Sequence, residues 1–429
     1  ATGAGAIAVQ IDGDNNRVVI GDQELTLERL HSRRATPENV NELLRTDVRA
    51  TTLVGREDAL ADLDAWRRGP ARIAVRCLIG RAGAGKTRIA IEACERAEAA
   101  AWVGAFIVTG ELERFHDHAN LLNWRLPQDV LLVVDNAATS AAVLKRWFTL
   151  IAPRRKDPEG GKLRILLLER HAHAEEGWWA DLNRVQSLTS AGSADLIGGE
   201  VPVELAPIRS LEERHALLAE TMRLAARLSD GDAAQSAPPP VGADKAFDAR
   251  LGSDAIETEP LYLMMAGVHA VTTGAPAALA LGRVELAKTM AGIERARAQA
   301  FATARGVPDE GAPFTRLLAC ITLQGGVPLS EVVGLAQEEL AAMPAASDYS
   351  PERAAEHLLD YLPERETRLE PVRPDLIGEA LLVPLVEGGR KRSREEQHAI
   401  VLRAHGRDPI GTVETLIRCA RDLAGGAAD

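Results

Sequence analysis

The chain has 429 residues, of which 46% are apolar and 26% are charged. This balance is typical of a soluble globular protein of about three domains, and it excludes disordered and collagen-like chains. The 62 acidic residues outnumber the 50 basic ones and give a net charge of −12, which disfavours a general surface for nucleic acid but is compatible with one local basic site.

Neither a membrane span nor a secretion signal is expected. No apolar run reaches the roughly 18 residues that a membrane helix needs. The first ten residues, ATGAGAIAVQ, lack a basic flank and a long apolar segment. The four cysteines, Cys77, Cys94, Cys320 and Cys419, form no C-x-x-C pair. We therefore expect a cytoplasmic protein without a zinc ribbon, whose cysteines are reduced core residues.

Residues 1–50 are predicted to form an N-terminal hairpin and a linker. Strands over 7–11 and 18–20 flank Asp12–Asn16, whose residues favour tight turns. Such a hairpin is too small to be a domain by itself.

Residues 51–208 are predicted to form an α/β domain. Short, continuous apolar runs alternate there with helical stretches, which is typical of parallel strands covered on both faces. The predicted strands are Ile73–Ile79, Trp102–Val108, Val130–Val134, Leu163–Leu168 and Val201–Leu205.

A phosphate-binding loop directly follows the first of these strands. It reads GRAGAGKT over 80–87, and a predicted helix over 88–97 follows it. Glycines allow the backbone N–H groups of such a loop to surround an anion, and the positive end of the helix adds to the attraction. The glycines concerned are Gly80, Gly83 and Gly85.

Three residues at the end of the loop are candidates for binding nucleotide. Lys86 is expected to reach the β- and γ-phosphates, and the hydroxyl of Thr87 is expected to bind Mg²⁺. Arg88, the next residue, is included among the nucleotide-binding candidates. The motif therefore predicts ATP or ADP with Mg²⁺ as the ligands.

The strand over 130–134 ends at Asp135, on the sheet edge where ligands of α/β sheets collect. We predict that Asp135 is the second protein ligand of the metal. Asn136 follows it, where many ATPases carry a second acid. An amide can orient water but cannot accept its proton, so hydrolysis is expected to be slow unless another group is the base.

The next strand ends with Glu169 and Arg170 at the same edge. We predict that Arg170 contacts the γ-phosphate, and that Glu169 orients it or is the missing base. The alternative is a solvated charge pair, because the ends of strands often carry charges.

Helices are predicted for most of the remaining chain. A helical domain is expected over 209–305, with a mobile insertion at 229–259 that is rich in proline and small residues. A winged-helix domain is expected over 306–390, because a pair of helices joined through a Gly-Gly dipeptide precedes an extended stretch. Residues 391–429 are expected to start a further helical region.

The motifs in this order resemble those of bacterial STAND NTPases, relatives of the NACHT and NB-ARC switches. The resemblance covers about residues 51–385 and indicates an α/β P-loop NTPase with a parallel sheet of the ASCE type, followed by a helical domain and a winged-helix domain. Besides the P-loop, the segments that carry it are Thr52–Glu57, Val133–Ala137, Ile165–Arg170, Gly177–Trp179, Glu204–Ile208, Glu259–Leu263 and Arg373–Glu379.

The resemblance implies a nucleotide that locks a closed monomer or permits an open oligomer. It places Val54 and Arg56 near the base and the ribose, and Pro260 against the adenine. It offers no counterpart of the winged-helix histidine that touches the β-phosphate in eukaryotic members. It also implies an effector and a C-terminal region that senses a protein trigger, so this chain is expected to be the central part of a longer protein.

The function expected is a nucleotide-dependent switch that assembles into a homo-oligomer, in bacterial defence or signalling. A transcription regulator that uses its winged helix on DNA and a cycling AAA-type ATPase are the alternatives. No membrane is expected as a partner, because no apolar run is long enough to span one. Nucleic acid is not expected either, because residues 313–344 contain one basic residue, Arg316, against three glutamates.

Overall fold

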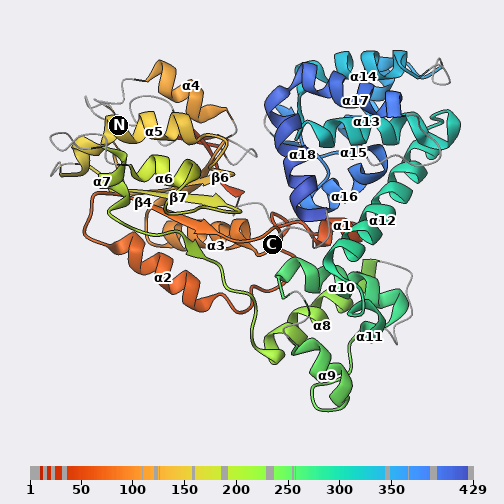
Figure 1. Ribbon diagram of the computed structural model, residues 1–429, viewed down its shortest axis with the longest axis horizontal. Coiled ribbons are helices and arrows are strands. Elements are labelled where there is room, and N and C mark those ends of the chain that lie inside the picture. Colours follow the sequence, from red (N-terminus) through yellow and green to blue (C-terminus); the bar gives the residue numbers. More distant parts are fainter. Residues whose placement is uncertain are drawn as a thin grey trace. The chain divides into compact units, whose positions relative to one another are not determined.

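The chain folds as two units, residues 1–36 with 46–213 and residues 37–45 with 214–429. The computed structural model (Figure 1) describes residues 10–12, 17–20, 25–30, 36–108, 110–119, 124, 126–156, 160–184, 192–228, 236–253, 256, 258–343, 348–365, 367–386 and 394–423. Residues 13–16, where the turn of the N-terminal hairpin was predicted, lie outside the described residues.

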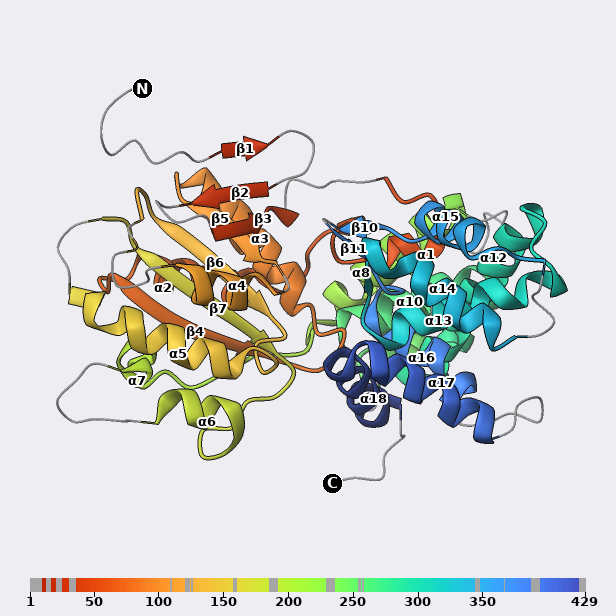
Figure 2. The ribbon, with the colours of Figure 1, turned by 90° about the horizontal axis from the view of Figure 1, so that it is seen from above.

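An eight-stranded sheet organises the first unit (Figure 2). Five strands are parallel, in the order β5-β6-β7-β4-β8, and three antiparallel strands continue the sheet beyond β5 in the order β3-β2-β1. The strands are β1 (Gln10–Asp12), β2 (Arg17–Ile20), β3 (Leu25–Glu28), β4 (Ile73–Ile79), β5 (Val103–Ile107), β6 (Val130–Asp135), β7 (Leu163–Glu169) and β8 (Val203–Glu204).

Helices cover both faces of this sheet (Figure 1). One face carries α4 (Glu111–His118), α5 (Ala141–Ile151), α6 (Gly177–Asn183) and α7 (Ser193–Ile197), and the other carries α2 (Glu57–Arg68) and α3 (Lys86–Ala99). Alternate residues of one strand reach opposite cores, so that Leu132 packs with the first group of helices and Leu131 with the second. Burial on both faces explains the continuous apolar runs of the central strands.

The N-terminal strands belong to the sheet and are not a separate region of the chain. Strand β3 pairs with β5, and Leu25 and Leu27 are fully buried in the core of the first unit. The backbone N–H of Thr26 donates to Oε1 of Glu111 over 2.6 Å, which joins β3 to the start of α4. The sequence showed the hairpin, but nothing local indicates its pairing with a strand eighty residues away.

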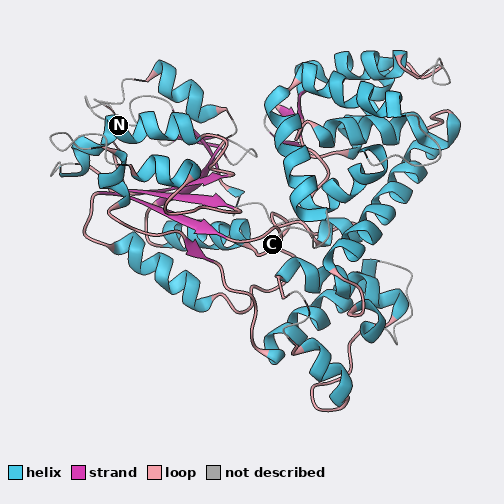
Figure 3. Ribbon diagram, in the orientation of Figure 1, coloured by secondary structure: helices cyan, strands magenta, loops and turns pink. Residues whose placement is uncertain are grey.

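The second unit is mostly helical (Figure 3). Its first helices are α1 (Val40–Leu43), α8 (Leu211–Leu228), α9 (Lys245–Leu251), α10 (Pro260–Thr273), α11 (Ala275–Ala278) and α12 (Arg283–Ala304). Most of α8 belongs here, because the boundary between the units falls at residue 214. Helices α11 and α12 are separate, and the longer one, α12, starts after Gly282.

The segment 229–259 is not the wholly mobile insertion that its composition suggested. Helix α9 lies within it, and the side chain of Asp244 caps this helix by accepting from the backbone N–H groups of Ala246 and Phe247. Phe247 and Leu251 are buried, and Nη1 of Arg214 donates to the carbonyl of Leu251 over 2.8 Å. Residues 229–235 of the segment lie outside the described residues.

The C-terminal part of the second unit combines helices with a small sheet. Strands β10, β11 and β9 pair antiparallel in this order. In chain order the elements are α13 (Ala312–Leu323), β9 (Val327–Pro328), α14 (Val332–Ala341), α15 (Pro351–Tyr361), β10 (Glu364–Arg365), β11 (Arg368–Leu369), α16 (Asp375–Val386), α17 (Arg394–Arg407) and α18 (Pro409–Leu423).

Two expectations about the whole chain concern membrane spans and cysteines. Among the described helices, none has the length and apolar character that crossing a membrane requires. All four cysteines carry free thiols, of which Cys77, Cys94 and Cys320 are buried and Cys419 is half-buried. Burial raises the pKa of the Cys320 thiol to about 12, so this thiol is unreactive at neutral pH.

Candidate functional site

The phosphate-binding loop connects the end of β4 to the first residue of α3. Gly83 and Gly85 have φ angles of 83° and 94°, in the left-handed region where a side chain is strained. A Cβ atom on Gly80 would lie 3.2 Å from Cβ of Ala84, closer than an ordinary contact. The backbone therefore requires glycine at positions 83 and 85, and it leaves little room for a side chain at position 80.

Lys86 lies over this loop. Its Nζ donates hydrogen bonds to the carbonyl oxygens of Gly80, over 2.5 Å, and of Arg81, over 3.1 Å. An ammonium group held by two neutral carbonyls can exchange them for phosphate oxygens, which form stronger, charge-assisted hydrogen bonds.

Thr87 and Asp135 meet at the adjoining end of β6. Oγ1 of Thr87 donates to Oδ2 of Asp135 over 2.9 Å, and Oδ1 of Asp135 accepts from the backbone N–H of Asn136 over 3.0 Å. Carboxylate and hydroxyl oxygens are the ligands that Mg²⁺ prefers, and both side chains are partly open to solvent. The pair therefore fits a magnesium ion that keeps most of its ligands as water and phosphate.

The order of the strands identifies the fold class of the first unit. Strand β7 lies between β4, which carries the phosphate-binding loop, and β6, which carries Asp135. This insertion of one strand between the two motifs distinguishes ASCE NTPases from other P-loop proteins. The first unit is an α/β P-loop NTPase domain of the ASCE type.

Glu169 ends β7, beside both motifs. It aligns with Ile79 of β4, and its neighbour Leu168 aligns with Asp135. Oε2 of Glu169 accepts from the backbone N–H of Ala138 over 3.0 Å, and Oε1 accepts from the backbone N–H of Arg170 over 2.6 Å. Each carboxylate oxygen thus fixes a segment of backbone, one of them in the turn after β6.

Asn136 and Arg170 lie at the same edge as Glu169. Asn136 has a φ angle of 54°, a left-handed conformation that asparagine and aspartate adopt more readily than most residues. Arg170 is 9% exposed, so its guanidinium is largely removed from water. The structure therefore brings Asp135, Asn136, Glu169 and Arg170, which end or follow two neighbouring strands, to one edge of the sheet.

Arg56 has contacts that sequence reasoning did not foresee. The side chain is buried, Nη1 donates to the carbonyl of Ala206 over 2.8 Å, and Nη2 donates to the carbonyl of Ala84 over 3.1 Å. Burial lowers the pKa of Arg56, an effect that the charge of Glu213 partly offsets. Arg56 therefore braces the phosphate-binding loop against the segment after β8, and its position near the base and ribose stays a prediction.

The remaining candidates lie on different elements. Arg88 points along α3, where Nη1 donates to Oε2 of Glu92 over 3.2 Å. Val54 is half-exposed in the segment before α2, and Pro260 is the first residue of α10 in the second unit. The nucleotide contacts implied for these three residues stay predictions.

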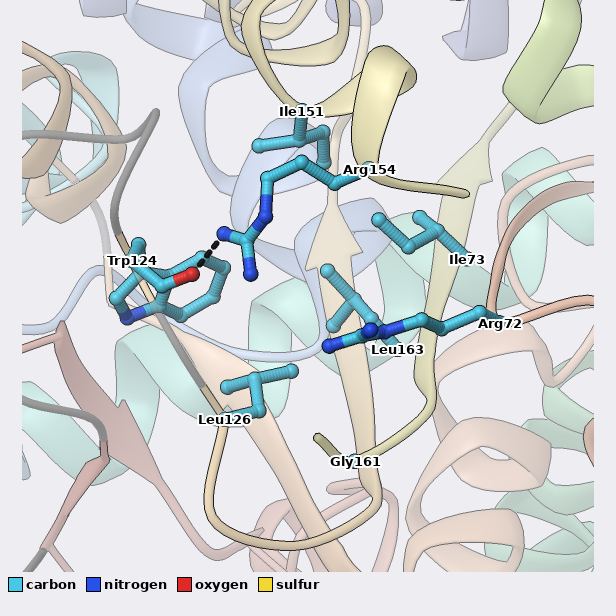
Figure 4. Close-up of a pocket in the computed structure, with 8 residues that line it drawn as sticks. All are labelled: Arg72, Ile73, Trp124, Leu126, Ile151, Arg154, Gly161 and Leu163. Atoms are coloured by element: carbon cyan, nitrogen blue, oxygen red, sulfur yellow. Dashed lines mark hydrogen bonds between the residues drawn. The ribbon is translucent and has the colours of Figure 1, made fainter. Parts of the chain in front are cut away.

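A small pocket opens at the opposite edge of the sheet (Figure 4). It is lined by the first residues of β4 and β7, Ile73 and Leu163, and by the arginines Arg72 and Arg154. Arg154 donates a hydrogen bond to the carbonyl of Trp124 beside it. Because the phosphate-binding loop follows the other end of β4, this pocket is distinct from the candidate nucleotide site.

No family model and no curated protein matches this chain. Solved structures resemble it loosely. A Walker-type ATPase of Pyrococcus abyssi has 12% identity and a TM-score of 0.31, over 82% of this chain and 99% of that one. The Orc1 protein of Aeropyrum pernix in complex with DNA has 15% identity and a TM-score of 0.31, over 80% and 96%. Cdc6p from Pyrobaculum aerophilum has 13% identity and a TM-score of 0.29, over 94% and 100%.

At such TM-scores the fold assignment rests on the strand order and the loop of this chain, and not on the likeness. The matches nonetheless correct one expectation. Nucleic acid was not expected as a partner, and that expectation is withdrawn, because the Orc1 structure contains DNA.

Proposed function

We propose that this chain is an ATP/ADP-dependent conformational switch of the STAND type, which controls its own oligomerisation and the activation of an effector in bacterial defence or signalling. The observation that supports a switch more than a motor concerns the two side chains that could activate water, because neither is a free carboxylate. Asn136 is an amide, and both carboxylate oxygens of Glu169 accept backbone N–H groups.

The roles of the site residues follow from their places. Lys86 and the loop glycines would hold the phosphates, and Thr87 with Asp135 would hold Mg²⁺, whose charge would neutralise that of the terminal phosphates. ATP and ADP differ only at the γ-phosphate, so a switch needs a contact that forms with ATP alone. Arg170, at the end of β7, is the proposed contact.

The domain assignment is part of the same proposal. Residues 209–305 would be the helical domain, residues 306–390 the winged helix and residues 391–429 the start of a sensor region. The elements from α13 to β11 support the second assignment, because helix, strand, two helices and two strands are the order of a winged helix. A protein trigger and an effector would be the partners of this switch.

Two measurements on purified protein test the switch. Turnover of Mg-ATP should be far below one per second, the low end of enzyme rates. With a non-hydrolysable ATP analogue and the trigger, light scattering should show a larger homo-oligomer than with ADP. Arg170→Ala should abolish this difference and leave ADP affinity nearly unchanged. Identical masses with ADP and with the analogue would reject the switch.

A cycling AAA-type ATPase is the alternative from another class, and it predicts sustained turnover of several per second without a trigger. The winged-helix order also favours a test for DNA. Fluorescence anisotropy of a labelled duplex, titrated with protein in ADP and in the ATP analogue, would detect DNA binding and its dependence on nucleotide.

A further inference from the structure

Residues 37–45 pass from one unit to the other and back. Their contacts place them in the second unit, although the residues before and after them belong to the first. We call this segment the strap. Its helix α1 lies among the helices of the second unit (Figure 2), and Leu43 and Leu44 are 0% and 3% exposed.

The strap also makes a buried polar contact with α12. Nδ2 of Asn41 donates to Oε2 of Glu294 over 2.5 Å, and Glu294 is only 3% exposed. The other oxygen of Glu294 accepts from Nη2 of Arg297 and from the hydroxyl of Tyr361, each over 2.8 Å. The strap therefore supplies one hydrogen bond of a carboxylate that water barely reaches, and losing a partner in such a place is costly.

Residues on either side of the strap, Arg29 and Arg49, are fixed to the same helix of the first unit. Before it, Nε of Arg29 donates to Oε1 of Glu98 over 2.6 Å, and after it, Nη2 of Arg49 donates to Oε2 of Glu95 over 2.6 Å. Glu95 and Glu98 are three residues apart on α3, which places them on neighbouring positions of one face. Helix α3 begins with Lys86, at the end of the phosphate-binding loop.

The return from the strap passes through a constrained residue. Arg49 has a φ angle of 55°, in the left-handed region that an arginine seldom adopts. Its charge is also felt at the start of α3, because the pKa of Arg88 is lowered first by burial and then by the charge of Arg49. Movement of the strap would thus shift the charge of Arg49 relative to the start of α3, next to the loop that would hold the phosphates.

We propose that the strap is a latch, whose docking against Glu294 couples the second unit to α3 and slows release of nucleotide from the phosphate-binding loop. The inference rests on the proposed nucleotide site and adds a means of regulating it. A docked strap restrains α3 at both of its anchors, and an undocked strap lets α3 and the loop move independently of the second unit.

The test compares three variants with the wild type. Asn41→Asp places a second carboxylate beside buried Glu294, where like charges repel strongly. Asn39→Ser keeps a capping side chain at the start of α1. Tyr361→Phe removes a hydrogen bond from the same carboxylate but leaves the bond from the strap. The readouts are release of a fluorescent ADP (mant-ADP) by stopped flow and hydrogen exchange of residues 38–45.

We expect Asn41→Asp to release mant-ADP at least threefold faster and to exchange faster over 38–45, and we expect both control variants to match the wild type. If Asn41→Asp fails to fold, Asn41→Ala should also speed mant-ADP release and hydrogen exchange over 38–45, but by a smaller factor. Faster exchange in the strap with unchanged release would overturn the latch and leave the nucleotide switch standing. A wild type that binds no mant-ADP would instead overturn the proposed function.

Discussion

The hydroxyl of Thr87 donates a hydrogen bond to the carboxylate of Asp135 over 2.9 Å, which joins the phosphate-binding loop to the end of β6. Oγ1 of Thr87 and Oδ2 of Asp135 would bind the same Mg²⁺. Removing the charge of the carboxylate should therefore weaken binding of the metal more than binding of the nucleotide. Asp135→Asn should raise the Mg²⁺ concentration needed for ATP binding by about tenfold or more, because an amide is a poor ligand for a hard cation.

Calorimetric titrations of ATP at several Mg²⁺ concentrations would measure this shift. Binding of ATP in the presence of a chelator should be nearly the same in the wild type and the variant. An unchanged Mg²⁺ dependence would exclude Asp135 as a ligand.

Replacing Lys86 by alanine should abolish tight nucleotide binding, because the variant lacks the charge that complements the terminal phosphates. At a hundredfold excess over Kd, ATP should stabilise the wild type by about 2.7 kcal/mol, and the variant should lose most of this gain. Thermal unfolding with and without Mg-ATP measures it. Lys162→Ala is the matched control, since its Nζ contacts the carbonyl of Gly69 at the opposite edge of the sheet.

Asn136→Asp tests whether the missing acid limits hydrolysis. The φ angle of 54° suits aspartate as well as asparagine, so the substitution should be tolerated by the backbone. We expect the hydrolysis rate to rise by about a hundredfold, the lower end of the range typical of general base catalysis. Asn136→Gly is the control, because it relieves the backbone without adding a base, and its rate should stay at the wild-type level.

Glu169 offers a separate test. Substituting it should change the hydrolysis rate if it is the base, and the free energy of unfolding if it only accepts backbone N–H groups. The NH2 group of glutamine cannot accept the N–H of Arg170, but its amide oxygen can still accept the N–H of Ala138. Glu169→Gln should therefore lower the hydrolysis rate far less than the roughly 10²–10⁴-fold expected for loss of a general base. Glu169→Ala leaves that N–H without its acceptor and should lower the free energy of unfolding by about 1–2 kcal/mol. Loss of hydrolysis in the glutamine variant with unchanged ATP affinity would identify Glu169 as the base.

The stability of the second unit should depend on pH through Glu339 of α14, whose side chain is fully buried among arginines. Nη2 of Arg403 and Nη2 of Arg407 donate to its oxygens over 2.7 Å and 3.0 Å, and Nη2 of Arg316 lies 3.4 Å away. Burial alone would raise the pKa of Glu339, but the hydrogen bonds from Arg403 and Arg407 outweigh burial and hold the pKa below its ordinary value.

A lowered pKa in the folded state means that this contribution to stability is complete above the ordinary pKa of glutamate, about 4.3, and is lost as the pH falls through the folded value. Glu339→Gln should lower the free energy of unfolding at pH 7 by about 3 kcal/mol. The variant should lose less further stability than the wild type between about pH 5 and pH 3. Urea unfolding across this range measures both effects. If the free energy of unfolding changed with pH in the same way in both proteins, Glu339 would not be the source of the pH dependence.

Local signals predicted the centre of the first unit well. The four long parallel strands were visible as apolar runs because each is buried on both faces, and the loop glycines were visible because only glycine suits their backbone angles. Strand β8 is shorter than the apolar run from Val201 suggested, and Val201 is 65% exposed. Burial, and not hydrophobicity alone, decides where a strand ends.

What sequence reasoning missed depends on contacts between distant segments. No local pattern indicates that residues 37–45 leave the first unit, or that Arg56 reaches the carbonyl of Ala84. The hydrogen bond from Ala138 to Glu169 likewise depends on the alignment of β6 with β7. Helix α9 was hidden because it has only seven residues and stands among prolines and small residues.

The three N-terminal strands also determine how an assembly assay must be designed. Without residues 1–30, strand β5 would present a row of unpaired N–H and C=O groups, and the neighbours of Leu25 and Leu27 in the core would be exposed. Such a shortened chain would associate edge to edge whatever nucleotide it held. Oligomers of a chain cut back to the phosphate-binding domain would therefore report a damaged sheet edge, and the N-terminal strands must be kept in every sample used to detect switching.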